Sequence, residues 1–327
     1  MMKMLTRSVL AGLALTVTTA YAADKLAVGV GSSTNENAKL AGAEAAKSAK
    51  AALGTSEPKL VLVFAARKQM GAELVAGVAS QFDQALIYGC EGYSPITTAG
   101  NFPDQGHTIK TGVAVLALGG EVTVTVASAT VAKTQDRKAG FMACGKNIGE
   151  QLKPLIGTTT TGKIILTFGN QHVGDNQPFV EGLTELLGTG IPIVGAAAGG
   201  DTAQELIKGE LVKGWNVAIL LSGAFKVGTG LAGGKDDLVG KADAAMATAI
   251  TAAGGRPVLG LVFDCGGRRG DLVKQGQITA EYEVIKKRVG TVPFFGFYGG
   301  GEIGVPAVGT AAKGVGFSAA TAVLSVE

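Results

Sequence analysis

Two short segments near the C-terminal end of the sequence carry the residues most suited to binding chemistry. Arg268 lies in "FDCGGRRGD", residues 263–271, and Glu302 follows three glycines in "GFYGGGEIG", residues 296–304. A guanidinium can hold a carboxylate through two hydrogen bonds, and a buried carboxylate needs a cationic partner. Facing each other across one crevice, Arg268 and Glu302 would bind the two charged ends of a zwitterion such as an amino acid.

The residues just before Glu302 could shape that crevice. Gly299, Gly300 and Gly301 have no side chains, can adopt positive φ, and offer backbone N–H groups to a small polar guest. We therefore expect them to form the floor of the site. Tyr298 could stack on a ligand or pack over the core, and both roles stay open.

Structural roles are also open for the charged candidates. Arg268 and Glu302 could form an ion pair that only seals the junction of two loops. Glu281, in the helical segment "TAEYEVIKKRVG" (279–290), could pair with Lys286 or Lys287 or could support the ligand site from behind.

The sequence offers little for catalysis. Cys265 lies close to Arg268 and is a candidate ligand contact and a weak thiolate candidate, whereas Cys90 has no histidine near it in the sequence. His107 and His172 are far apart, and neither a C-x-x-C spacing, a G-x-S-x-G motif nor a phosphate-binding loop is present. We expect no catalytic residues, no metal and no cofactor.

The elements that position these residues recur three times. Apolar runs that end in Phe are typical of buried strands: "KLVLVF" (59–64), "KIILTF" (163–168) and "VLGLVF" (258–263). Each is followed by a helical segment, by a second apolar run that ends in glycine, and by another strand: "VAVLAL", "NVAILLSG" and "TAVLSV".

Equivalent residues recur about a hundred positions apart, which indicates tripled units and not a solenoid. The predicted equivalent sets are Phe64, Phe168 and Phe263; Gly89, Gly195 and Gly296; and Ala114, Ala218 and Ala322. We predict an α/β fold of three consecutive βαβαββ-like repeats that form mixed sheets covered by helices. The first two strands after each opening helix should pair in parallel, and the last strand could pair antiparallel.

The N-terminus resembles a secretory signal. Lys3 and Arg7 precede a short apolar run, and Ala20-Tyr21-Ala22 has the pattern of a cleavage site, so residues 1–22 are predicted to be a signal peptide. Its removal lowers the formal net charge from +3 to +1, which argues against a nucleic-acid partner. We expect the mature protein to be periplasmic or secreted.

The segments "LVFDCGGRRGD", "AEYEVIKKRVGTVPFFGFYGGGEIG" and "TAVLSV" resemble the C-terminal part of FIST proteins, and "VGVGSSTNENAKLAGAEAAKSA" and "LIYGCEGYSPIT" resemble the N-terminal part. The resemblance implies a sensory module for small ligands such as amino acids, with a FIST N-terminal part at 23–226 and a C-terminal part at 227–327. Such a module would signal through a separate partner, a membrane receptor or a signalling protein. The glycines at 299–301 replace a bulkier residue expected in the family, so the shared ligand preference is open.

Two other functions compete with ligand sensing. Tripled α/β folds include ring-opening amidohydrolases that use serine and lysine, although these residues do not recur at equivalent strand ends here. A structural role in the cell envelope is the other alternative. The sequence does not decide whether Cys90, Cys144 and Cys265 form a disulfide.

Overall fold

A computed structural model of the protein describes residues 25–98, 111–132, 135–157, 162–200 and 202–327. The predicted signal peptide lies outside the described residues. Among the helices that the structure describes, none combines the length and apolar character needed to span a membrane.

The first unit opens with an alanine-rich helix between two strands, as the sequence predicts. Its elements are β1 (Ala27–Ser33), α1 (Ala38–Leu53), β2 (Pro58–Ala66), α2 (Ala72–Ala79), a 3₁₀ turn (Gln84–Leu86), β3 (Ile87–Gly92), β4 (Ser94–Thr97) and β5 (Val113–Gly119).

The second unit repeats this order and adds a short hairpin. Its elements are β6 (Val122–Thr130), α3 (Arg137–Leu152), a 3₁₀ turn (Lys153–Leu155), β7 (Gly162–Gly169), α4 (Asn176–Leu187), β8 (Ile193–Ala197), β9 (Glu205–Ile207), β10 (Glu210–Val212) and β11 (Trp215–Gly223).

The third unit has one helix more than the sequence predicts. It contains β12 (Lys226–Gly233), α5 (Leu238–Ala253), β13 (Arg256–Cys265), α6 (Gly266–Lys274), α7 (Ile278–Val289), β14 (Phe294–Gly299), β15 (Glu302–Gly304), β16 (Lys313–Val315) and β17 (Ser318–Val326). Residues 266–271 of "FDCGGRRGD", interpreted from the sequence as part of a loop after the Phe263 strand, lie in α6.

Each unit builds the main part of one mixed sheet. In the described residues the strand orders are β1-β5-β2-β3-β9-β10, β16-β15-β8-β7-β11-β6 and β12-β17-β13-β14-β4. The pairs β2·β3, β7·β8 and β13·β14 are parallel, and the last strand of each unit pairs antiparallel with the central strand. Both predictions of strand direction are thus confirmed.

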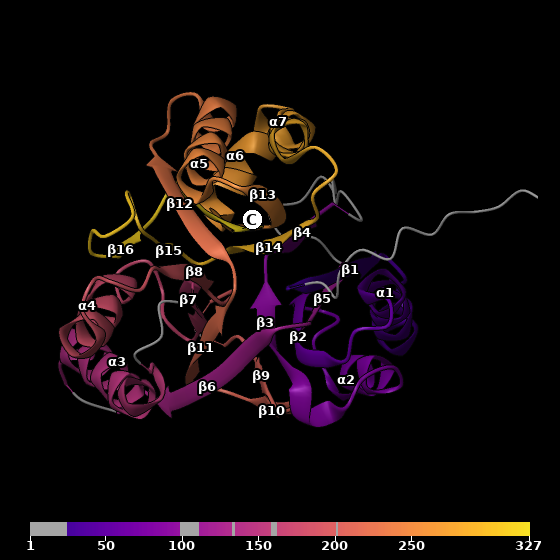
Figure 1. Ribbon diagram of the computed structural model, residues 1–327, viewed down its shortest axis with the longest axis horizontal. Coiled ribbons are helices and arrows are strands. Elements are labelled where there is room, and N and C mark those ends of the chain that lie inside the picture. The colour runs from indigo at the N-terminus through magenta and orange to yellow at the C-terminus, as the bar shows by residue number, and fades with distance from the viewer. Residues whose placement is uncertain (1–24, 99–110, 133–134, 158–161, 201) are drawn as a thin grey trace, which may run out of the picture.

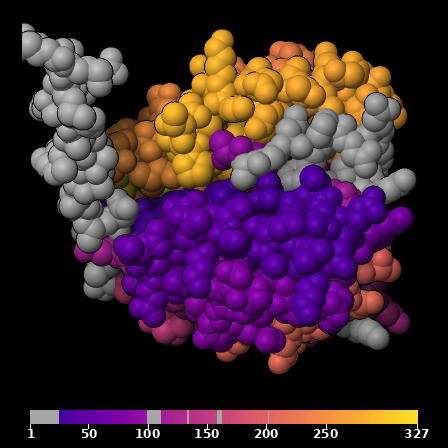
Figure 2. Space-filling model, turned by 90° about the vertical axis from the view of Figure 1, so that its right-hand side faces the viewer, coloured from indigo at the N-terminus to yellow at the C-terminus, as the bar shows by residue number. Residues whose placement is uncertain are grey.

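The units also exchange strands in a circle, which the sequence does not reveal. β4 of the first unit joins the third sheet, β9 and β10 of the second unit join the first sheet, and β15 and β16 of the third unit join the second sheet. Figure 1 shows the three units arranged around a common centre, with strands inside and helices outside. Figure 2 shows the first unit along one side of the molecule, with the third unit resting on it.

A common core fills this centre, and the central strand of each sheet, β2, β7 or β13, is largely buried. On β2, Leu62 and Phe64 point into the central cluster, whereas Val61 and Val63 pack against α1 and α2 on the outer face. In the sequence, strands that are buried on both faces appear as continuous apolar runs. The Phe64 ring lies 5.8 Å from that of Phe168 and 6.4 Å from that of Phe263, measured between centroids.

Strand pairing tests the predicted equivalent positions. Phe64, Phe168 and Phe263 each pair with the residue that follows the repeated glycine of the parallel neighbour, so the phenylalanine and glycine sets are confirmed. In the alanine set, Ala114 is confirmed, whereas Ala218 and Ala322 lie one and two residues after the equivalent positions. The partners of the three phenylalanines on the last strands are Ala114, Val217 and Ala320.

Candidate functional site

The predicted site residues come from the ends of β13 and β14 and from α6, α7 and β15. β13 and β14 are parallel neighbours, so Asp264 and Tyr298 are paired residues at the same end of the third sheet. α6 begins directly after Cys265, which places Arg268 one helical turn beyond Asp264. The predicted loop forms a helix because Gly266 and Gly267 allow close packing: a side chain there would meet the rings of Tyr93 and Phe317.

Arg268 is bound by two carboxylates, and neither is Glu302. Its Nε donates to Asp264 Oδ1 at 2.8 Å, and its Nη2 donates to Glu281 Oε1 at 2.6 Å and to the carbonyl of Leu238 at 2.9 Å. The predicted structural ion pair with Glu302 is therefore wrong. Arg268 Nη1 has no hydrogen-bond partner among the described residues.

Glu281 belongs to the same cluster. Tyr298 donates its hydroxyl to Glu281 Oε2 at 2.6 Å, so this carboxylate binds Arg268 and Tyr298 and not Lys286 or Lys287. Burial and the nearby Asp264 raise the pKa of Glu281 to about 8, although Arg268 and Tyr298 partly oppose that shift. The alternative that Glu281 supports a ligand site from behind stays a prediction.

Glu302 lies in the same buried region but is held differently. Its Oε2 accepts from the backbone N–H of Ser318 at 3.0 Å, and its Oε1 has no partner among the described residues. Burial and the charge of Asp264 raise its pKa well above the ordinary value, and Ser318, Cys265 and Arg268 offset only part of this. Its burial thus favours the protonated form of Glu302 more than exposure to water would.

Cys265 is next to this acid. Burial and then the charge of Glu302 raise the pKa of its thiol to about 11, so the group is a thiol and not a thiolate at neutral pH. Cys90, Cys144 and Cys265 are all free and buried.

Within the described residues of this region, buried carboxyl groups outnumber buried guanidiniums. Asp264, Glu281 and Glu302 are fully buried together with Arg268 and Arg269, and the guanidinium of Arg269 lies 5.9 Å from the centroid of the Tyr298 ring. Among the residues that the structure describes, three buried carboxyl groups thus lie with two buried guanidiniums. Isolated buried charge is costly, so this excess of carboxyl groups favours protonation of one of them or binding of a cation.

The three glycines do not form an open floor. A side chain on Gly299 would meet the carbonyl of Ala197, and one on Gly300 would approach the carbonyl of Ala198 at 2.8 Å. Gly301 has a φ of 135°, and a side chain there would approach the Asn176 amide at 2.8 Å. The absence of side chains at these glycines thus allows close packing against the second unit. The expectation that they form the floor of a ligand site is corrected accordingly.

Sequence reasoning missed two members of this buried polar cluster and one related buried glutamate in the first sheet. Asp264 was within the quoted segment, and its spacing of four from Arg268 becomes informative once α6 is known to be a helix. Ser318 contributes a backbone N–H, which leaves no trace in the sequence. Glu205 on β9 pairs with Cys90, and Glu302 on β15 pairs with Ala196. Cys90 and Ala196 each follow the repeated glycine, so the two buried glutamates occupy equivalent positions.

These features define a class of protein: three helix-covered mixed α/β sheets around one core, with a charged cluster enclosed in the third unit. The chain matches the FIST N domain over residues 59–241 and the FIST C domain over residues 215–305. The protein belongs to the FIST family, whose domains are of the sensory type. The division predicted at residues 226 and 227 lies where the two matches overlap and stays a prediction.

Two solved structures of cyanuric acid hydrolase are similar to the chain. One, titled as an evolutionary innovation by structural concatenation, has 11% sequence identity and a TM-score of 0.47, covering 92% of this chain and 100% of the other. The other, from A. caulinodans, has 10% identity and a TM-score of 0.48, with coverages of 92% and 99%. Comparison with curated protein sequences finds no match.

Proposed function

We propose that the protein is a sensory ligand-binding protein for amino-acid-like zwitterions, and that the buried cluster of the third unit receives the charged ends of the ligand. The proposal includes export of the mature chain and transmission of the liganded state to a separate partner, a membrane receptor or a signalling protein. Family membership supports a sensory role.

One observation carries the proposal: Arg268 Nη1 and Glu302 Oε1 are buried in one region without partners among the described residues. Buried polar atoms are nearly always satisfied in folded proteins. A ligand carboxylate would accept from Nη1, and a ligand ammonium would satisfy Glu302. Because the side chains are fully buried, entry requires the cluster to open around Cys265, which is 8% exposed.

Protonation gives the proposal a distinctive signature. Burial raises the pKa of Glu302 well above its ordinary value, and an incoming ammonium would lower it by favouring the ionised form. Binding would therefore release a proton. The protonated thiol of Cys265 also supports binding over nucleophilic catalysis.

Isothermal titration calorimetry with a panel of amino acids tests this function. We expect saturable binding at pH 7 whose heat depends on the ionisation enthalpy of the buffer. Glu302→Gln should weaken binding by about tenfold or more and abolish the buffer dependence. Glu205→Gln, at the equivalent buried position of the first sheet, is the matched control and should bind normally. Absence of binding by every zwitterion, or equal binding by uncharged analogues, would reject the proposal.

A further inference from the structure

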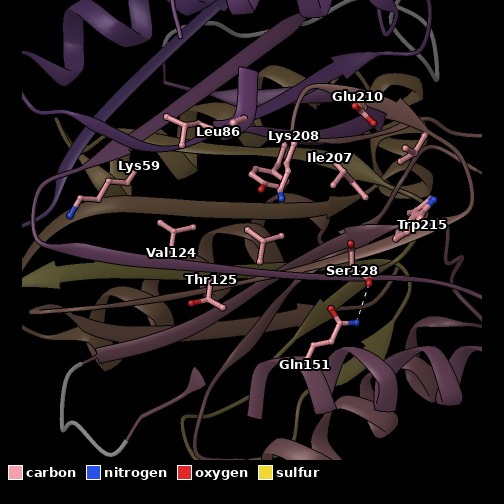
Figure 3. Close-up of a pocket in the computed structure, with 14 residues that line it drawn as sticks. Lys59, Leu86, Val124, Thr125, Ser128, Gln151, Ile207, Lys208, Glu210 and Trp215 are labelled. Atoms are coloured by element: carbon pink, nitrogen blue, oxygen red, sulfur yellow. Dashed lines mark hydrogen bonds between the residues drawn. The ribbon is translucent and has the colours of Figure 1, made fainter. Parts of the chain in front are cut away.

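A cavity lies between the first and second units, lined by residues distant in the sequence from the charged cluster. It has a volume of about 700 Å³, which is within the range of small-molecule sites. Figure 3 shows Lys59 at one end and Trp215 at the other, with Val124 and Thr125 on one wall and Leu86 on the opposite wall. β6 of the second unit provides one wall, and β2, β3, β9 and β10 of the first sheet provide most of the other.

Several hydrogen-bond donors that line this cavity make no bond to other described residues, and the two lysines among them are exposed to solvent. Within the part of the chain that the structure describes, the amines of Lys59 and Lys208 and the indole N–H of Trp215 have no hydrogen-bond or ion-pair partner. Among the described lining residues these two lysines face a single carboxylate, Glu210. The lining therefore carries an excess of positive charge, which favours an anionic ligand.

The backbone of Lys208 is an independent sign of function. Lys208 and Gly209 form the two-residue turn between β9 and β10, with φ values of 52° and 72°. Type I′ hairpin turns need positive φ at both positions and favour Asn-Gly, so lysine is an unfavourable choice at the first position. The same turn presents the Lys208 side chain to the cavity (Figure 3). Such strain is characteristic of functional positions.

The rest of the lining suits an apolar body. Val124, Val126, Ile207 and Val212 surround the space, and Trp215 is the one tryptophan in the sequence. An indole offers a flat face for stacking and an N–H for an acceptor. A ligand with an aromatic ring and one carboxylate would satisfy both the apolar walls and the unpaired donors.

The two related unit junctions lack this combination. The cavity where β1 meets the start of β13 has a volume of about 420 Å³. The cavity near the start of β7 and β12 has about 310 Å³, and Phe225 packs against Gly162 there. Neither is lined by a tryptophan in the described residues. The junction of the first and second units is therefore distinct within an otherwise repeated architecture.

We propose that this cavity is a second ligand site that binds small aromatic carboxylates, with the carboxylate near Lys208 and the ring against Trp215. It is separate from the cluster around Arg268 and does not depend on the function proposed for that cluster. Lys59 adds attraction at the other end of the cavity.

Trp215 provides the readout for a test with the intact protein. Titration with benzoate or 3-phenylpropanoate should change the tryptophan fluorescence in a saturable way, and equilibrium dialysis of labelled benzoate should give the same dissociation constant. Benzamide, which has the ring without the charge, should bind at least about tenfold more weakly.

Lys208→Asn removes the charge and keeps a residue that tolerates positive φ, so the turn should fold. This variant should bind benzoate about tenfold more weakly or worse. Lys68→Asn, an exposed lysine outside the cavity lining, is the charge-matched control and should bind as the unmodified protein does. Failure of benzoate to bind in dialysis, equal affinity for benzamide, or unchanged affinity in Lys208→Asn would overturn the proposal.

Discussion

At the scale of single residues, the protein stores several carboxyl groups away from water. Glu302 and Glu205 occupy equivalent strand positions, each is fully buried, and each has an Oε1 without a partner among the described residues. Burial and then the charge of Glu91 raise the pKa of Glu205 to about 8, against the opposing hydrogen bond from the Trp215 backbone. The other titratable neighbour of Glu205 is Cys90, whose thiol pKa is itself raised by burial and then by Glu205.

This arrangement predicts how stability depends on pH. The folded-state pKa of Glu205 exceeds the ordinary value of 4.5, so the folded protein binds this proton more tightly than the unfolded chain does. The contribution is fully present below about pH 4.5 and is lost as the pH rises to about 8. We therefore expect the melting temperature to fall between pH 5.5 and pH 8.

Glu205→Gln should reduce that fall, because the amide cannot ionise. Circular dichroism melts of both proteins at the two pH values provide the measurement. Glu210→Gln, an exposed site on the adjoining strand β10, is the control and should keep the original slope. An unchanged slope in Glu205→Gln would show that this carboxyl group does not titrate between these pH values.

The sequence predicted which of these residues lie close together better than how they bind one another. Arg268, Glu281 and Tyr298 do meet, because strand ends and the helices that follow them converge at one end of the sheet. Their pairing depends on α6, and its first residues are two glycines, which are poor helix formers. Helix propensity therefore could not reveal that Arg268 binds Asp264 and Glu281.

At the scale of elements, the repeated glycines are the clearest link between sequence and fold. Gly89, Gly195 and Gly296 lie on β3, β8 and β14, where a Cβ would overlap the carbonyl oxygen of Val63, Thr167 or Val262 on the parallel neighbour. Glycine inside a strand commonly marks such a close backbone approach. The short strands β4, β9 and β15 had no comparable signal, since three or four residues are too few to show a periodicity.

Gly296→Ala should consequently destabilise the fold by about 3 kcal/mol or more, since the added methyl meets rigid backbone and β13 and β14 must separate. Urea denaturation followed by circular dichroism measures this. Gly190→Ala, where the added Cβ has open space and φ is not positive, should change stability by less than about 0.5 kcal/mol. Equal effects of the two substitutions would contradict the proposed packing role.

At the scale of the whole molecule, the circular exchange of strands makes the units interdependent. The third sheet obtains β4 from the first unit, and the third unit gives β15 and β16 to the second sheet. Phe295 and Phe297 of β14 stack on Phe64 of the first unit, with centroids 4.9 Å and 4.3 Å apart. A tripled sequence therefore predicts three similar sheets. The sequence pattern within one unit cannot show which sheet its exchanged strand, β4, β9 or β15, joins.

Separation of the third unit tests this interdependence. A fragment of residues 227–327 would keep β13 and β14 but lose β4, which would leave a sheet edge and several phenylalanine rings in contact with water. We expect the isolated fragment to show no cooperative thermal transition. Mixed with a fragment of residues 23–226, it should form a one-to-one complex that melts cooperatively, as followed by circular dichroism and native mass spectrometry. If residues 227–327 alone melt as cooperatively as the complex, the exchanged strands do not hold the units together, and the third unit is an independent domain.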